Sequence, residues 1–189
     1  QLSAGKKVLY LNFSICNGFC KSMGLEPDVD MGDLFYLLRE DEEALLAKLK
    51  SGIYPLGSYQ IIPPPSNPEH YMEWRKGEVR HFLEILLEKT DFEVLVLDMG
   101  CVMNGFFEVL DLCGRIWILK EHRTSKDSGI EELRELLEKF KAGLEERVEE
   151  VFLPGGQAWR EDGTIQVEEF YMGEVGNCVR RLLGGEYAS

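Results

Sequence analysis

Val94-Leu95-Val96-Leu97-Asp98 is the stretch that decides the fold: four apolar residues in a row, ended by a carboxylate. A continuous apolar run of this length is typical of a strand buried on both faces, as in a parallel sheet covered by helices. Met99-Gly100 follows directly and indicates a turn. We therefore expect Asp98 to lie where the sheet meets solvent or a ligand.

The rest of the chain alternates apolar strands with one-sided helices. Apolar runs predict further strands at four places: Val8–Leu11, Tyr59–Ile62, Arg115–Leu119 and Val148–Leu153. Apolar residues at helical spacing predict helices from Met31, over Glu42–Leu49, over Lys76–Lys89, after Ser128 and over Glu174–Leu183. This alternation predicts an α/β fold with a mostly parallel, doubly wound sheet and helices on both faces, in three layers. We expect a single domain over residues 1–189.

The chain is strongly acidic. Among 189 residues, 34 Asp and Glu stand against 21 Lys and Arg, which gives a formal net charge of −13. Because binding to a nucleic-acid backbone needs a basic face, we expect no nucleic-acid partner. No apolar run reaches the roughly 20 residues of a membrane span, so any membrane contact would be peripheral.

Cysteine and histidine usage gives no sign of a disulfide framework or a structural metal centre. The five cysteines are an odd number without regular spacing, and the histidines His70, His81 and His122 are scattered. A secreted disulfide scaffold would show a regular cysteine framework. We therefore expect a cytoplasmic location, where thiols stay reduced.

Polar residues follow two of the predicted strands. Asp98 ends one strand, and Asn12 and Ser14 follow another. In parallel sheets, ligands bind beyond the carboxyl ends of the strands. Asp98 could hold Mg²⁺ directly or through water, or it could cap the next turn. Asn12 and Ser14 could orient a water or a ribose, or form a turn, but neither can act as a general base.

The sequence lacks the common catalytic and phosphate-binding motifs. The Gly5-Lys6 dipeptide precedes a strand, whereas a phosphate loop follows a strand and opens a helix. Gly155-Gly156 is a glycine-rich turn without a lysine, and no G-x-S-x-G motif indicates a nucleophile. Since no positioned cation would meet the phosphates, we expect that this 189-residue chain does not hydrolyse ATP at a useful rate.

Four segments, taken in order, resemble the MinD/ParA-type ATPases with deviant Walker motifs. Gly5–Ser14 resembles their second strand, whose pattern ends in D-x-D, and Met31–Leu38 resembles one of their helices. Ile61–Pro64 resembles a strand ending in a proline-marked loop, and Phe92–Gly100 resembles the Walker B strand. Within this family the chain is most similar to the TadZ/CpaE branch, which is associated with Tad pilus assembly and polar localisation.

The resemblance implies a P-loop NTPase-like fold and nucleotide-dependent localisation or assembly of a cell-envelope machine such as a Tad pilus. It implies a homodimer, protein partners in that machine, and ATP and Mg²⁺ as cofactors. The alternative is a non-hydrolysing pseudo-ATPase scaffold that acts through protein–protein contacts. In either case the implied site residues are Asp98 at the metal, Asn12, Ser14 and Gly100 beside the nucleotide, and Pro154-Gly155 on the side of the base.

Two departures from the family pattern bear on activity. Asn12 and Ser14 stand where the family has two acidic residues, of which the first is held to activate the attacking water. The family's phosphate-loop strand and most of the following helix would precede Gln1, so we expect a truncated N-terminus. That strand lies beside the Walker B strand in the family, so Val94–Leu97 should lack a neighbour. We expect an upstream segment, a rearranged strand or a second copy to fill the place.

Overall fold

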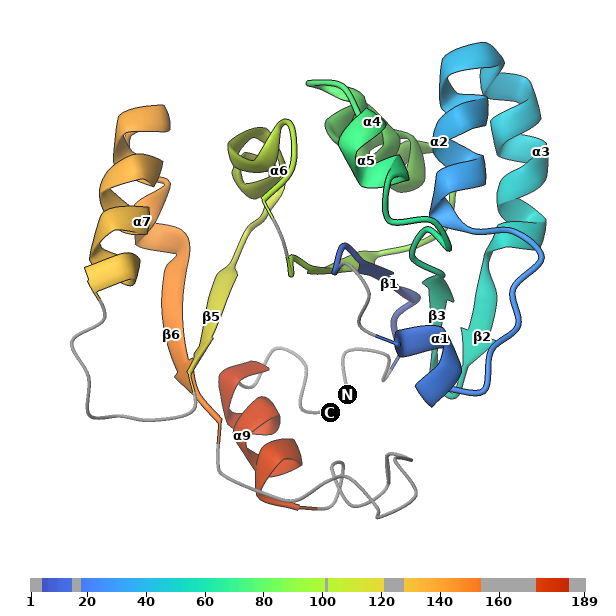
Figure 1. Ribbon diagram of the computed structural model, residues 1–189. Coiled ribbons are helices and arrows are strands. Elements are labelled where there is room, and N and C mark those ends of the chain that lie inside the picture. Colours follow the sequence, from blue (N-terminus) through green and yellow to red (C-terminus); the bar gives the residue numbers. More distant parts are fainter. Residues whose placement is uncertain (1–4, 15–17, 101, 121–127, 154–172, 184–189) are drawn as a thin grey trace.

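Two sheets form the centre of the computed structural model (Figure 1). The structure describes residues 5–14, 18–100, 102–120, 128–153 and 173–183. In the larger sheet the strands lie in the order β2-β3-β1-β4, formed by Tyr54–Leu56, Tyr59–Ile62, Val8–Asn12 and Val94–Asp98. The smaller sheet pairs β5 with β6, which are Ile116–Lys120 and Val148–Phe152.

The pairing is parallel for all the long strands, as expected. β1 pairs with β4 from Val8↔Val94 to Asn12↔Asp98, and it pairs with β3 on its other edge. β5 and β6 are parallel as well. The antiparallel strand β2 was not predicted; it is short and contains Pro55, which is tolerated because β2 lies at the edge of the sheet.

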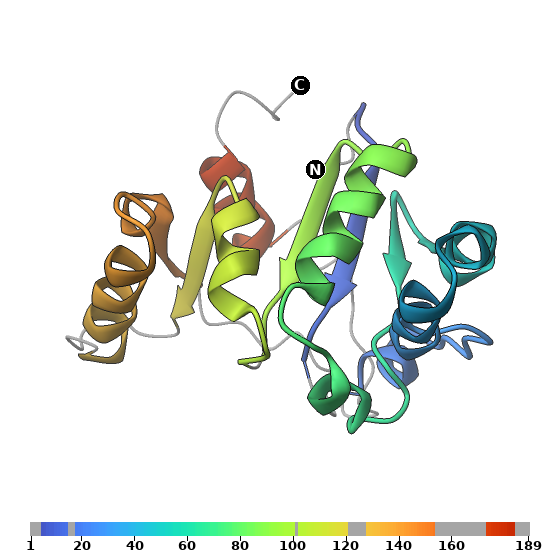
Figure 2. The ribbon, with the colours of Figure 1, turned by 90° about the horizontal axis from the view of Figure 1, so that it is seen from above.

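Helices cover both faces, but unevenly (Figures 1 and 2). One face carries α2, α3, α5, α6 and α7, whereas α1 and α9 lie on the other. A short helix, α4, precedes α5. The helices span Phe19–Ser22 (α1), Met31–Glu40 (α2), Glu42–Gly52 (α3), His70–Glu73 (α4), Glu78–Lys89 (α5), Phe106–Leu112 (α6), Ser128–Phe140 (α7) and Glu174–Leu183 (α9), and a 3₁₀ turn spans Glu145–Arg147.

The apolar core has two parts that meet at α6. The larger cluster packs α2, α3 and α5 on the large sheet and includes Val109 of α6. The smaller cluster packs α6 and α7 on β5 and β6 and includes Leu110. Phe107 of α6 also stacks on Phe140 of α7, with ring centroids 5.6 Å apart. Helix α6 therefore joins the two sheets through side-chain packing.

A capping box holds the start of α2 beside the proline loop after β3. The buried Asp30 carboxylate accepts hydrogen bonds from the backbone N–H groups of Gly32 (2.7 Å) and Asp33 (3.2 Å), and Asp33 accepts in return from the N–H of Asp30. The other oxygen of Asp30 accepts from Ser66 N at 2.7 Å. This one side chain thus positions both the helix and the loop.

Some expectations differ from the structure in detail. Arg115 precedes β5, which continues to Lys120, and β6 ends at Phe152. The expected single sheet is divided in two, because no described strand pairs with the second edge of β4. The apolar patterns predict which residues form strands, but they do not encode which strand is the neighbour of which.

Candidate functional site

The candidate site lies where β1 and β4 end. The parallel register places Asn12 directly opposite Asp98. Beyond the last pair, the N–H of Phe13 donates to the carbonyl oxygen of Asp98 at 2.8 Å. The chain that leaves β1 therefore stays beside the end of β4, and the polar residues predicted for this edge come together.

Asp98 presents an exposed carboxylate that a neighbouring hydroxyl holds in place. The hydroxyl of Tyr10, two residues before Asn12 on β1, donates to Oδ2 of Asp98 at 2.7 Å. Burial of the Tyr10 ring, followed by the hydrogen bond to Asp98 and the charge of that carboxylate, raises the pKa of the tyrosine hydroxyl. Tyr10 thus stays protonated and remains a donor at neutral pH. No hydrogen bond to the other carboxylate oxygen is found among the described residues.

Asn12 is almost fully buried, with 1% of its surface exposed, and its side chain shapes the turn after β1. Its Oδ1 atom accepts from the backbone N–H of Ser14 at 2.8 Å. Its Nδ2 atom donates to the Tyr10 hydroxyl at 3.4 Å, and its carbonyl accepts from the hydroxyl of Tyr71 at 3.0 Å. Of the two alternatives for Asn12, the structure shows turn formation.

Gly100 and Ser14 bring the two loops of the site into contact. A Cβ atom added to Gly100 would lie 2.6 Å from Cβ and 2.9 Å from Cα of Ser14. Real Cβ atoms do not approach other atoms so closely, so a side chain at position 100 would push the loops apart. Glycine is therefore required for the close approach of the loop after β4 to the loop after β1.

The structure brings four of the predicted site residues to one edge, namely Asp98, Asn12, Ser14 and Gly100. Pro154 and Gly155 lie outside the described residues. Tyr10 was missed because it lies within an apolar run, where a tyrosine is expected to be part of the core, and Tyr71 was missed because it lies 59 residues from Asn12. The only sequence signal was for Tyr10: it lies two residues before Asn12, so both side chains share one face of β1.

Chemically, the edge offers one charged ligand. A single carboxylate can hold Mg²⁺ when water and phosphate oxygens complete the coordination sphere. Within the described ranges no three or more His, Cys, Asp or Glu side chains gather into a site that would hold a metal by themselves. The described part of the chain also has no helix with the length and apolar character of a membrane span.

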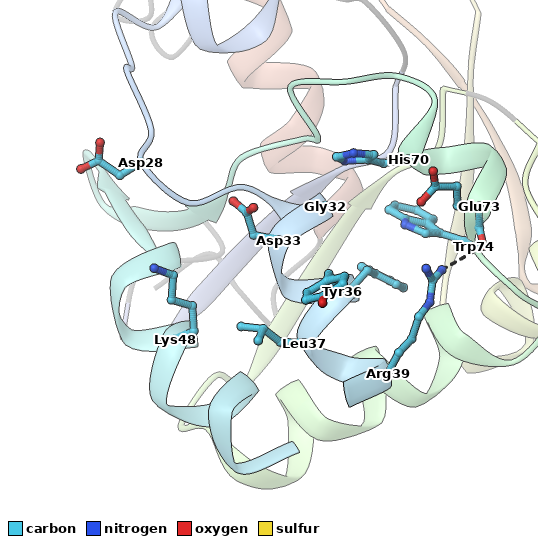
Figure 3. A pocket seen from close by; sticks show the side chains of 11 residues that line it. Asp28, Gly32, Asp33, Tyr36, Leu37, Arg39, Lys48, His70, Glu73 and Trp74 are labelled. Carbon is cyan, nitrogen blue, oxygen red and sulfur yellow. Dashed lines mark hydrogen bonds between the residues drawn. The ribbon is translucent and has the colours of Figure 1, made fainter. Parts of the chain in front are cut away.

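A cavity of about 390 Å³ lies along α2 and α4, and it shares no residue with this edge (Figure 3). Its Arg39 is already engaged: its guanidinium donates twice to the carboxylate of Glu78, at 2.9 and 2.8 Å, and to the carbonyl oxygen of Glu73 at 2.9 Å. Nδ1 of His70 is buried without a hydrogen-bond partner among the described residues. Acidic and basic side chains line the cavity together, including Asp33, Glu73 and Lys48, so it shows no preference for a ligand of one charge.

No family model and no curated protein matches the sequence. Solved structures match by fold. A ParA family ATPase from Chlorobium tepidum aligns with a TM-score of 0.63 at 18% identity, covering 80% of this chain and 63% of that one. MinC:MinD, a cell division protein complex from Aquifex aeolicus, aligns at 0.55 with 16% identity, covering 90% and 66%. Cobyrinic acid a,c-diamide synthase from Mycobacterium smegmatis, with bound ADP and magnesium, aligns at 0.53 with 14% identity, covering 92% and 70%.

These similarities show the fold. The chain has the mixed α/β architecture, with a parallel sheet and helices, of the ParA/MinD-type ATPases, as expected from the sequence. It spans less than two thirds of the ParA and MinD chains that it matches. Because fold alone does not determine function, the activity has to be argued from the edge formed by β1 and β4.

Proposed function

We propose that this protein localises or assembles a cell-envelope machine, such as a Tad pilus, under the control of a bound nucleotide. The observation that carries the proposal is the exposed carboxylate of Asp98, held by Tyr10 at the carboxyl end of β4. In a parallel α/β sheet this is the edge where ligands bind. The fold is shared with ATPases, and the sequence resemblance favours the TadZ/CpaE branch.

The residues at this edge fit a nucleotide with Mg²⁺ in part. Oδ1 of Asp98 would hold the metal, directly or through water, and the Ser14 hydroxyl lies close to Gly100. Bound Mg²⁺ would neutralise charge on the phosphates. No glycine-rich loop with a lysine follows a strand within the described ranges, so the cradle for the phosphates would come from other parts of the polypeptide.

The same geometry favours binding over turnover. Asn12 occupies the position of the acid that is held to activate water in the family, and its amide oxygen is already bonded to the Ser14 N–H. An amide cannot accept a proton from water at neutral pH. We therefore propose that the nucleotide acts as a ligand that sets the conformation of the protein. This conformation would control homodimer formation and the binding of protein partners.

A pseudo-ATPase scaffold that needs no nucleotide is the second candidate. The turn-forming role of the Asn12 side chain favours it, because that side chain serves the fold and leaves no group free for catalysis. Such a protein would act through its surface alone. In that case Asp98 would have no role in localisation.

Localisation in the source cells separates the two candidates. A fluorescently labelled protein should form foci at the envelope, and Asp98→Ala should disperse them while protein level stays unchanged. Asp91→Ala is the matched control, since this exposed carboxylate lies before β4 and pairs with Lys7. Foci that persist in Asp98→Ala would favour the scaffold. A wild-type protein that never forms foci would refute a role at the envelope.

A further inference from the structure

The cavity along α2 and α4 is a groove that is open to solvent (Figure 3). This α2–α4 groove is bordered by Asp33, Tyr36 and Arg39 of α2 and by His70, Glu73 and Trp74 in and after α4. Asp33, Tyr36 and Glu73 are exposed. A small-molecule site normally encloses its ligand within mostly apolar walls. The α2–α4 groove instead suits a ligand that lies along the surface, such as a segment of a second protein.

The α4 wall of the groove is held in place before any ligand binds. A helix of four residues is not stable by itself, so α4 depends on its contacts. Tyr71 donates to the carbonyl oxygen of Asn12 at 3.0 Å, and Asn104 donates to the carbonyl oxygen of Trp74 at 2.9 Å. The Trp74 ring also stacks on Phe35 of α2, with centroids 4.1 Å apart. A ligand would therefore meet a preformed wall, fixed to the end of β1 and to the loop after β4.

The middle of the groove is apolar and carries an exposed aromatic side chain. Phe35 and Trp74 line the groove and are buried, whereas Tyr36 is 63% exposed. In Figure 3, Tyr36 and Leu37 lie between the charged side chains at the two ends. Tyrosine is enriched in protein interfaces, because its ring buries a large area while its hydroxyl tolerates water. Tyr36 thus offers a contact surface for an apolar side chain.

Glu73 is the unpaired charge at one end of the groove. Arg39 lies beside it, but its guanidinium makes two hydrogen bonds to the carboxylate of Glu78. Arg75 also pairs with Glu78, at 4.0 Å. No ion pair of Glu73 is found among the described residues. A basic side chain of a partner would therefore be favoured at Glu73.

Lys48 of α3 lies at the other end of the groove (Figure 3). Asp28 and Asp33 line the same end, yet neither forms an ion pair with Lys48 within the described ranges. Asp33 is engaged in the capping box of α2, where its Oδ2 accepts from the N–H of Asp30 at 3.0 Å. Lys48 is thus the group at this end that can pair with an acidic side chain.

We propose that the α2–α4 groove docks a short segment of a partner protein, in which an apolar residue stands between a basic and an acidic residue. The apolar residue packs on Tyr36, the basic residue pairs with Glu73, and the acidic residue pairs with Lys48. Polypeptide is the class of ligand that combines both charges and an apolar side chain on one short chain. The proposal is argued from the lining of the groove and does not rest on nucleotide binding.

Selection from a library of short random peptides tests the groove. The target is the full-length protein, expressed from its own reading frame and free of nucleotide, and peptides that also bind Tyr36→Ala are removed. The remaining peptides should share an apolar residue with a basic residue on one side and an acidic residue on the other. They should bind Tyr36→Ala about tenfold more weakly than wild type. Because Tyr36 is exposed, this variant should fold like wild type.

Charge reversal tests which end of the groove takes which charge. Glu73→Lys should weaken binding of a selected peptide about tenfold, and replacing the basic residue of the peptide by glutamate should restore binding to this variant. Lys48→Glu should act in the same way on the acidic residue of the peptide. Glu69→Lys is the matched control, because Glu69 is exposed and lies just before α4 but does not line the groove.

Several results would overturn the proposal. These are a library that yields no peptide dependent on Tyr36, selected peptides that lack the two charges, and charge reversals at Glu73 and Glu69 that weaken binding equally. A peptide with the exchanged charge that does not regain binding would do the same. Sedimentation of the free protein tests for a second copy in the groove: self-association that is lost in Tyr36→Ala would contradict a separate partner.

Photochemical crosslinking in the source cells tests whether a natural partner uses the groove. A photoreactive amino acid in place of Tyr36 should capture a protein whose sequence contains a segment of the selected kind. Capture should fall about tenfold when Glu73→Lys is added and stay unchanged when Glu69→Lys is added. Equal capture with both added substitutions, or a captured protein without such a segment, would contradict the proposal.

Discussion

β1 and β4 are neighbouring strands of the same length and nearly the same composition, yet they lie in different surroundings. β1 is paired on both edges, and Leu9 and Leu11 are completely buried. β4 is paired on one edge, and its four apolar residues are all only half-buried. An apolar run therefore indicates which residues can be buried, while the strands and helices next to it determine how completely their side chains are buried.

The largest expected difference between the two strands concerns core truncation. Leu9→Ala should cost about 2–5 kcal/mol of unfolding free energy, because a fully buried side chain leaves a cavity. Leu95→Ala, at the paired position on β4, should cost clearly less, since this side chain is already partly in contact with solvent. Urea unfolding of both variants measures the difference. Equal losses would mean that β4 is as well covered as β1.

The second-largest effect is expected at the contact between the loop after β1 and the loop after β4. Gly100→Ala should cost about 1–3 kcal/mol, because the new methyl group would collide with Ser14. Gly114→Ala is the matched control, since its added Cβ atom would meet nothing within 4 Å. Unfolding midpoints of the two variants decide the point. A Gly100→Ala protein as stable as Gly114→Ala would show that the loops do not touch.

The stability that the contact between α2 and α5 gives to the fold should depend on pH. Burial acts to raise the pKa of Glu78 on α5, but hydrogen bonds from Arg39 of α2 and the backbone N–H of Arg75 outweigh it and hold this pKa below its ordinary value. A lowered folded-state pKa stabilises the fold above the unfolded pKa of about 4.5, and this contribution is lost as pH falls through the folded value.

Glu78→Gln should therefore cost about 1–2 kcal/mol at pH 7, and the difference from wild type should shrink below about pH 4.5. Stability curves between pH 3 and pH 8 measure this. Glu84→Gln is the control: its partner Arg80 lies four residues before it on α5 in a more exposed pair, so little change is expected. A loss of stability in Glu78→Gln that does not vary with pH would contradict a lowered pKa of Glu78 in the folded state.

The smallest expected effect concerns the bond that links the two strands at the site. Tyr10→Phe removes the hydroxyl that donates to Asp98 and should cost about 0.5–1 kcal/mol, because the acceptor is exposed to water and can be solvated. Tyr59→Phe, on β3, is the comparison, since no hydrogen bond of its hydroxyl is found among the described residues. Thermal unfolding of both variants provides the values. A larger loss for Tyr59→Phe would refute this role of Tyr10.

Sequence patterns predicted the long elements and one edge of the site. Asp98, Asn12 and Ser14 could be placed together because the carboxyl ends of parallel strands share an edge. The hydroxyl groups that organise that edge could not be predicted, since Tyr10 lies 88 residues from Asp98 and Tyr71 lies 59 residues from Asn12. Nor could the division into two sheets, because apolar runs carry no information about pairing partners.

Thermal unfolding with Mg²⁺ and ATP tests whether the carboxyl end of β4 binds a nucleotide. The full-length protein, expressed from its own reading frame, is compared with its Asp98→Ala variant. At ligand concentrations about 100-fold above Kd, the Tm of the parent should rise by about 5–10 °C, and the variant should lose most of this rise. A parent protein whose Tm does not change, or a variant whose Tm rises equally, would show that Asp98 does not hold a nucleotide with Mg²⁺.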